Sequence, residues 1–214
     1  MKTSEMIALG IVAVSFIIAI NLYPDMPEEM PSHWNAAGEV DGYLPRIWGL
    51  FLMPLIALGM LALFMALPRM TSLSMNIKSF RREYEIFVVV ISGFMFYIYL
   101  LTLLWVLDLQ FNMVHMIIPA FAVIFYCSGM LMPKTKRNNY IGIRTPWTLA
   151  SDGVWEKTHK LGGKMFKLAG LVSLVGLLFD GYFAFLFLIV PVIIVVIYAM
   201  VYSYIEYKKE RSKG

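Results

Sequence analysis

Residues 133–163 read PKTKRNNYIGIRTPWTLASDGVWEKTHKLGG, and this stretch is the longest polar segment of a very apolar chain. Of the 214 residues, 60% are hydrophobic and only 15% are charged, and the mean hydropathy is +0.72. Soluble domains contain about 45–50% apolar and about 25% charged residues. The composition therefore indicates an integral membrane protein, in which residues 133–163, here called the basic loop, connect two membrane-spanning stretches.

The apolar stretches on either side of the basic loop are long enough to span a bilayer. A helix needs about 20 apolar residues to cross the hydrocarbon core. Six stretches meet this requirement: residues 5–23, 47–67, 86–107, 113–132, 165–179 and 182–205. The fifth is the shortest and needs flanking side chains such as Lys164 and Lys167 to extend to the membrane surface. Because backbone groups in lipid must pair internally and no alternating barrel pattern occurs, we predict an all-α integral membrane protein with six transmembrane helices.

The basic residues predict the orientation of these helices. They gather before helix one, between helices two and three, between helices four and five, and after helix six. The other three connections together contain a single basic residue, Arg46. Basic loops remain in the cytoplasm. We therefore predict cytoplasmic N and C termini, a cytoplasmic basic loop and an outer loop at residues 24–46. The net charge of +4 favours anionic lipid head groups as partners and does not indicate nucleic acid.

The outer loop begins with three prolines, Pro24, Pro27 and Pro31, which exclude a regular helix and favour an extended segment. Gly38 and Gly42 mark tight turns further along. Aromatic side chains suited to the head-group layer accompany them. We expect a compact, ordered cap on the outer face of the bundle.

The basic loop itself begins at Pro133, which ends helix four. Its first basic residues, Lys134, Lys136 and Arg137, either anchor the topology against anionic lipid or form a patch that binds an anion or a partner. Further along, Arg144 either clamps the loop internally or pairs with Glu156, a lipid phosphate or a helix end.

The second half of the basic loop carries helix signals. Thr145 followed by Pro146 is typical of a helix N-cap with proline at the first helical position, and Ser151 is a rival N-cap. Apolar residues recur at helical spacing from Trp147 to Leu161, which predicts a short amphipathic helix in the inner interface. Gly162–Gly163 would end this helix or provide the turn into helix five. Within it, His159 is interpreted as a hydrogen-bonding residue and not as a catalyst.

Catalytic and transport chemistry is largely absent from the sequence. The central portions of the six predicted helices contain no ionisable residue, which argues against an ion-coupled transporter. The motifs of hydrolases, metalloproteases, thiol oxidoreductases and P-loop proteins are missing, and the single cysteine, Cys127, excludes a cysteine metal site. Acidic outer residues with His33 and His115 are a weak candidate for a cation site, but a solvated acidic rim is simpler. We predict no metal and no cofactor.

The basic loop resembles the signature region of the SdpI family of membrane proteins. The outer stretch MPEEMPSHWNAAGEVDGYLPR, residues 26–46, resembles the short domain of uncharacterised function common at the start of such proteins. The two motifs cover about a quarter of the chain. Here Leu44, Pro45 and Arg46 stand where the outer motif often has a lysine-containing turn, so the resemblance does not predict the conformation of this turn. The resemblance implies two units, residues 1–67 with two helices and the outer loop, and residues 68–214 with four helices and the basic loop.

The resemblance also implies a function. The family's namesake protects a cell from a secreted hydrophobic toxin peptide, SdpC, and holds a cytoplasmic transcriptional repressor at the membrane when toxin is bound. By this resemblance, the chain is expected to be a non-enzymatic immunity and receptor protein of the cell membrane, with a toxin peptide and possible repressor as partners. Motif matches give the outer binding residues as His33, Trp34, Asn35, Gly38 and Gly42. They give the inner ones as Lys134, Arg137, Asn139, Gly142, Arg144, Thr145, Pro146, Trp147 and Trp155.

Two alternative interpretations remain open at this point. The chain can be a membrane transporter, or a membrane-embedded enzyme acting on a small molecule, lipid or peptide, with its site between the outer cap and the helices. Alternatively, both motifs only stabilise the helix bundle. Substitution of His33 or His159 by alanine separates the first alternative from a binding protein, because a catalyst loses function abruptly while it remains folded.

Overall fold

The computed structural model describes residues 2–69, 77–109 and 111–212 of the chain. These residues contain six long helices: α1 (Thr3–Leu22), α2 (Arg46–Ala66), α4 (Arg81–Val106), α5 (Met113–Leu131), α7 (Asp152–Ser173) and α8 (Gly181–Arg211). All six are long and apolar enough to cross a membrane, which confirms the predicted multi-pass membrane protein. Short 3-10 turns adjoin four of them, η1 (Tyr23–Asp25), η2 (Leu67–Arg69), η3 (Met132–Lys134) and η4 (Leu174–Leu178).

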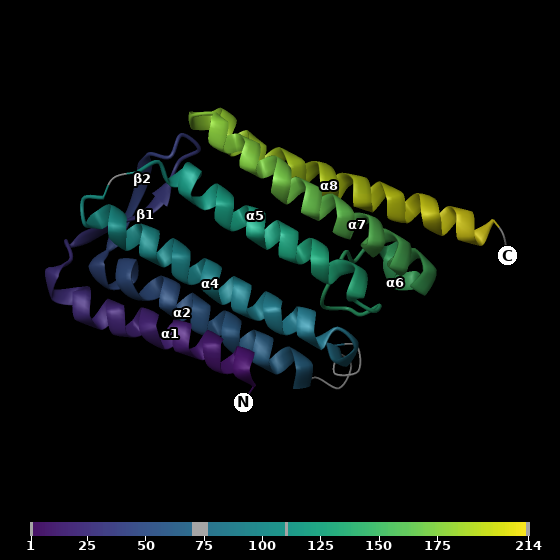
Figure 1. Ribbon diagram of the computed structural model, residues 1–214, viewed down its shortest axis with the longest axis horizontal. Coiled ribbons are helices and arrows are strands. Elements are labelled where there is room, and N and C mark those ends of the chain that lie inside the picture. The colour runs from purple at the N-terminus through teal and green to yellow at the C-terminus, as the bar shows by residue number, and fades with distance from the viewer. Residues whose placement is uncertain (1, 70–76, 110, 213–214) are drawn as a thin grey trace.

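The helices lie side by side in two groups (Figure 1). Helices α1, α2 and α4 pack together, while α5 packs against both α4 and α7, and α8 packs against α7. The two predicted units therefore share an interface, because α4 of the second contacts both helices of the first. Their division at residue 67 stays a prediction. Figure 1 shows the N terminus, the short helix α6 (Pro146–Ala150) and the C terminus at one end of the bundle, here called the loop end.

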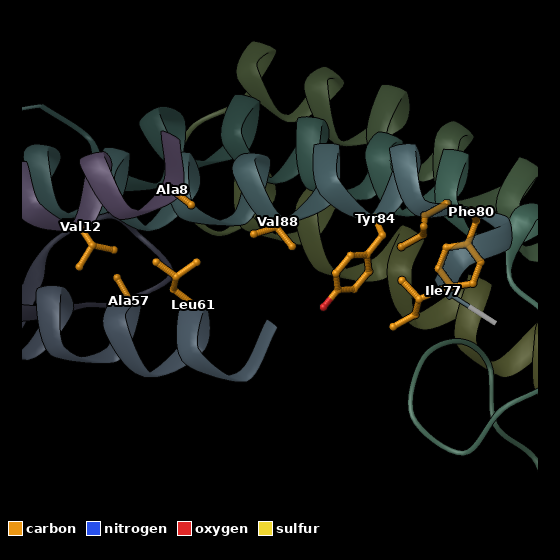
Figure 2. Packing of buried hydrophobic residues seen from close by; sticks show 9 residues of the cluster. Ala8, Val12, Ala57, Leu61, Ile77, Phe80, Tyr84 and Val88 are labelled. Carbon is orange, nitrogen blue, oxygen red and sulfur yellow. The ribbon is translucent and has the colours of Figure 1, made fainter. Parts of the chain in front are cut away.

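The first group is held by close packing of small and branched side chains. Figure 2 shows Ala8 of α1 and Ala57 of α2 in a buried cluster with Val88 and Tyr84 of α4. Small residues bring helices close together in lipid, where dispersion contacts replace the hydrophobic effect as the source of helix association. The Tyr84 hydroxyl donates a 2.7 Å hydrogen bond to the Phe64 carbonyl, so its polar atom is satisfied within the cluster.

The opposite end of the bundle carries a β-hairpin, which the sequence analysis described only as an ordered cap. Strands β1 (Glu29–Trp34) and β2 (Val40–Pro45) pair antiparallel, with two irregularities in the register between Pro31 and Trp34. A two-stranded sheet has two edges, so Pro31, which lacks an N–H, is tolerated in β1. The outer segment is largely extended, as its prolines predict, and its extended parts pair as strands, whereas Pro24 lies in the 3-10 turn η1.

Methionine packing fastens this hairpin to the helices. Met30 of β1 is fully buried in a cluster with Leu50 of α2 and Tyr99 of α4. It lies against Gly49 of α2, where a Cβ would stand 2.6 Å from the Met30 Cβ. Because only glycine leaves room there, the hairpin rests directly on the α2 backbone. This end of the bundle is called the hairpin end.

The predicted bounds of the interfacial helix in the basic loop, residues 147–161, are wrong. Helix α7 begins at Asp152 and continues without a break through Gly162 and Gly163 into the fifth membrane span. The predicted amphipathic stretch is therefore divided between the five-residue α6 and the first half of the long helix α7. The two glycines neither end a helix nor form a turn.

Gly163 instead brings α7 into backbone contact with α5, whereas Gly162 lies against the Ile143 side chain of the basic loop. A Cβ on Gly163 would lie 2.8 Å from the carbonyl oxygen of Gly129, and one on Gly129 would lie 2.5 Å from that of Gly163. The same relation recurs about two turns deeper, where a Cβ on Gly170 would lie 2.8 Å from the Ala122 carbonyl oxygen. Small residues at such spacing are typical of membrane helices whose backbones approach closely.

This contact predicts the effect of adding one methyl group. We expect Gly163→Ala to lower the free energy of unfolding by about 1–3 kcal/mol, because the backbone of α5 must move to admit the new Cβ. The matched control is Gly93→Ala in α4, where a Cβ meets nothing within 4 Å and alanine favours the helix. Thermal unfolding of both variants in detergent makes the comparison, and equal stability would contradict the proposed backbone contact.

Candidate functional site

The start of the basic loop is organised by one asparagine. The Asn138 side chain accepts hydrogen bonds from the backbone N–H groups of Tyr140 and Ile141, and its amide donates to the carbonyls of Lys136 and Ile141. All four bonds are 2.7–3.0 Å long, and Asn138 is buried. This local pairing folds the chain back on itself, as asparagine commonly does in turns.

The centre of the loop lies on a stacked aromatic pair at the start of α7. The rings of Trp155 and His159 stack with centroids 4.0 Å apart, and both residues are at most 2% exposed. The indole N–H of Trp155 donates a 2.9 Å bond to the Thr135 carbonyl. The Trp155–His159 pair is therefore the buried surface against which the loop packs.

His159 uses both ring nitrogens to hold the loop. Its Nδ1 lies 2.8 Å from the Trp155 carbonyl oxygen, and its Nε2 accepts a 2.9 Å bond from the backbone N–H of Ile143. Since a carbonyl only accepts and a backbone N–H only donates, the imidazole is neutral with its proton on Nδ1. This satisfied geometry agrees with the predicted structural role of His159.

Gly142 allows the backbone of the loop to lie directly against the His159 imidazole. Its φ is +121°, a conformation that residues with a Cβ rarely adopt, and a Cβ there would collide with His159 Nε2. Gly142 therefore combines a backbone requirement with a steric one.

Two predicted arginines clamp the loop from its surface. Arg137 bonds the Leu149 carbonyl at the end of α6 and forms a 2.8 Å ion pair with Asp152 at the start of α7. Arg144 donates a 2.6 Å bond to the backbone carbonyl of Asn139, so Asn139 takes part through its backbone. The internal clamp suggested for Arg144 is present, although its partner is this carbonyl and not a carboxylate.

Both rival N-caps are used, on two successive helices. The Thr145 hydroxyl accepts from the Thr148 N–H and caps α6, with Pro146 in its first turn, and Ser151 accepts from the Val154 N–H and caps α7. Thr145 also lies 3.0 Å from the Ser203 hydroxyl of α8. Thr148, which the motif did not single out, is fully buried and bonds the Ile143 carbonyl.

Charged residues then fasten the loop to the last turns of α8. Glu206, whose side chain is only 8% exposed, pairs with Lys157 of α7 at 2.8 Å and with Lys209 at 2.9 Å. Ser151 donates to the Glu210 carboxylate at 2.8 Å, and the Trp147 ring lies 5.0 Å from that of Tyr204. The basic loop, the start of α7 and the end of α8 thus form one packed surface.

Of the predicted loop residues, only Lys134 lies apart from this surface. It belongs to η3 and lines a separate cavity between α4, α5 and α7. The others converge on the packed surface, together with Asn138, Thr148 and His159, which were not chosen as binding residues. Asparagine and threonine at a turn are too common for a single sequence to mark them, because only the fold shows which ones are buried.

At the hairpin end, the predicted residues shape a tight turn. Asn35 accepts bonds from the N–H groups of Ala37 and Glu39 through its side-chain oxygen, at 2.9 and 3.1 Å. His33 lies 2.5 Å from the carboxylate of Asp41 across the strands, and both side chains are largely exposed. Gly42 lets the strands approach, because a Cβ there would lie 2.9 Å from the His33 Cβ.

Gly38 connects the tip of the hairpin to α5. Its φ is +85°, and a Cβ would stand 2.5 Å from the side-chain oxygen of Asn112. Asn112 caps α5 by accepting from the His115 N–H and donates a 3.1 Å bond to the Ala37 carbonyl at the hairpin tip. Asn112 was not predicted as a site residue, and its link to residue 37 is visible only in three dimensions.

Trp34 places an aromatic side chain between the hairpin and α4. Its ring meets that of Trp105 edge to face, with centroids 6.3 Å apart. Its buried indole N–H has no hydrogen-bond partner in the described ranges. Across residues 2–69, 77–109 and 111–212, no group of three His, Cys, Asp or Glu side chains is arranged to hold a metal ion.

The predicted residues therefore form two sites at opposite ends of the bundle (Figure 1). Both sites are built from hydrogen bonds, ion pairs, turns and aromatic contacts. Such surfaces are suited to binding.

Comparison with known proteins agrees with this picture. Residues 134–203 match the SdpI/YfhL protein family, and residues 10–58 match DUF1648, a domain of unknown function. Over residues 134–203 the chain is thus similar to the SdpI/YfhL family. The SdpI/YfhL match runs from the start of the basic loop to Ser203, so it spans the loop and much of the helix on which the loop packs. The DUF1648 match includes the hairpin.

A curated relative matches nearly the whole chain. The Immunity protein SdpI of Bacillus subtilis (strain 168) is 27% identical over 208 residues, which are 96% of this chain and 96% of that protein. No solved structure gives a significant match. The resemblance inferred from the two motifs is thus confirmed, and it extends over 208 residues of this chain.

The loop geometry predicts the effect of a side chain at Gly142. We expect Gly142→Ala to cost about 1–3 kcal/mol in local stability, because it strains φ and displaces the His159 imidazole. Limited trypsin digestion of the purified protein should then cut faster after Arg137 and Arg144. The control is Gly153→Ala, where the nearest atom to a Cβ is a carboxylate oxygen at 3.4 Å. Equal cutting rates in the two variants would contradict this role of Gly142.

The two bonds of Asn112 can be separated by substitution. Asn112→Ala removes both and should lower the free energy of unfolding by about 1 kcal/mol, as expected for a lost N-cap. Asn112→Asp keeps the cap and loses only the donor to Ala37. We expect Asn112→Asp to retain the thermal stability while backbone amides 35–39 exchange hydrogen faster. Unchanged exchange in this variant would show that the hairpin does not depend on the link.

Proposed function

We propose that this chain is a non-enzymatic immunity protein of the cell membrane, which resists a secreted toxin peptide. The observation that carries the proposal is the match with an immunity protein over 96% of both chains. A match of this extent includes both the hairpin and the basic loop, so it supports a shared mechanism as well as a shared fold.

We place the loop end in the cytoplasm and the hairpin end outside. The distribution of basic residues supports this orientation, because Arg46 is the only lysine or arginine in the predicted connections at the hairpin end, residues 24–46, 108–112 and 180–181. Figure 1 is consistent with it, since the N terminus, the basic loop and the C terminus lie at one end. In this orientation the hairpin is the first ordered element that a peptide meets from outside.

The contacts described above connect the two ends. The Ala37 carbonyl at the hairpin tip accepts a hydrogen bond from Asn112 at the start of α5, and the α5 backbone contacts that of α7. Helix α7 in turn contains the stacked Trp155–His159 pair against which the basic loop packs. We propose that toxin binding at the hairpin end favours a state in which the loop surface holds a cytoplasmic repressor protein. The continuity of these contacts supports the coupling.

A survival assay tests the immunity function. Toxin-sensitive cells that express the wild-type chain should survive an SdpC-type peptide, whereas cells with the empty vector should not. Arg144→Ala, shown to reach the membrane, should lose protection because it removes the clamp on the Asn139 carbonyl. Gly93→Ala serves as the control, since its Cβ enters open space.

The possible outcomes separate the parts of the proposal. Protection by both the wild type and Arg144→Ala would retain immunity and remove the loop clamp from its mechanism. Failure of the wild type at confirmed expression would contradict resistance to this peptide and favour the transporter or enzyme alternatives. Fractionation of the repressor between membrane and cytosol, with and without toxin, tests the second partner.

A further inference from the structure

A cavity at the loop end lies outside both sites described above. It has a volume of about 300 Å³ and opens between α4, α5 and α7. Its lining includes three basic residues from three separate elements, Arg82 of α4, Lys134 of η3 and Lys167 of α7. The neighbouring Glu83 also lines it, so positive charge exceeds negative by two among the lining side chains.

These three cations differ from nearby Arg81 and Lys157, each of which has a carboxylate partner. Arg81 forms an ion pair with Glu85, and Lys157 forms one with Glu206. No ion pair in the described residues includes Arg82, Lys134 or Lys167. The cavity thus gathers positive charge that the protein itself does not neutralise.

Lys167 lies deeper in the bundle than an ordinary loop lysine. It is one helical turn beyond Gly163, and a Cβ on Gly129 would lie 2.9 Å from the Lys167 backbone nitrogen. Its side chain is half-buried, and its ammonium lies 5.9 Å from the centroid of the Tyr126 ring. A lysine at the edge of the hydrocarbon region is costly unless its stem lies along apolar surface and its charge finds a partner.

The remaining wall of the cavity is apolar. Phe87 of α4 and Leu131 of α5 line it beside the cations. This combination matches an amphipathic ligand whose anionic group meets the basic residues while its hydrocarbon part follows the helices. Basic pockets between membrane helices on the cytoplasmic side are suited to phospholipid head groups.

We propose that this cavity binds the phosphate of an anionic membrane lipid, with Arg82, Lys134 and Lys167 as its ligands. The chemistry recognised is a phosphate group, and the apolar wall favours a lipid over free phosphate. The proposal goes beyond the immunity function and does not depend on it, because lipid binding can be measured without toxin.

The test uses the full chain, purified in neutral detergent and stripped of lipid. Native mass spectrometry should show tighter binding of phosphatidylglycerol than of phosphatidylcholine with the same acyl chains. Lys167→Gln should weaken phosphatidylglycerol binding about fivefold, as expected for the loss of one cation. Lys164→Gln is the matched control, because Lys164 lies on the same helix, is exposed and does not line the cavity.

A second variant keeps the proposal testable if Lys167→Gln unfolds. Arg82→Gln changes an exposed residue of the same cavity and should weaken phosphatidylglycerol binding by a similar factor. Equal binding of the two lipids, or equal loss with Lys164→Gln, would overturn the site. Complete displacement of phosphatidylglycerol by millimolar inorganic phosphate would show a free anion as the occupant and overturn the lipid assignment.

Discussion

The contact between Gly129 of α5 and Gly163 of α7 is the constraint on which the loop end depends. Without side chains at either position, the two backbones approach until a Cβ on one would touch the carbonyl of the other. Lipid tails are as apolar as the helices, so close packing takes the place of hydrophobic burial in holding such a pair. Because α7 begins well before Gly163, its first turns project past the end of α5 and carry Trp155 and His159. The basic loop then folds on that projecting segment, which makes the loop part of the helix bundle and not an appendage.

The hairpin end uses the same strategy with different residues. The absence of a side chain at Gly49 lets Met30 pack on the α2 backbone, and its absence at Gly38 lets the Asn112 side chain pack on the hairpin tip. At both ends, therefore, a glycine marks the place where an extramembrane segment meets a helix. Hydrogen bonds add direction to these contacts, because a polar side chain then pairs with the adjoining backbone, as Asn112 does with the Ala37 carbonyl. The result is a chain whose extramembrane motifs are rigidly related to its spans.

Hydropathy and proline placement were sufficient to predict much of this arrangement. The six spans follow from the length of the apolar stretches, and the caps at Thr145 and Ser151 follow from the preference of hydroxyl side chains for helix starts. The pair Gly162–Gly163 shows the limit of such reasoning, because a glycine pair that ends a helix and one that lies inside a helix against close neighbours look the same in one sequence. The hairpin was missed for a related reason: its strands are short, irregular in register and interrupted by proline. The roles of Asn138 and Asn112 depend on partners that only the fold brings near.

Helix α8 comprises 31 residues, which corresponds to a length of about 46 Å. A hydrocarbon core is about 30 Å thick, so about 16 Å of this helix extends beyond it. The basic loop is bonded to the last turns of this helix at Ser203, Glu206 and Glu210, and the two glutamates lie beyond the apolar stretch that ends at residue 205. The position of the loop relative to the bilayer is consequently tied to the end of this helix. Any tilt or vertical shift of α8 within the membrane therefore also moves the basic loop, which is bonded to the end of this helix outside the bilayer.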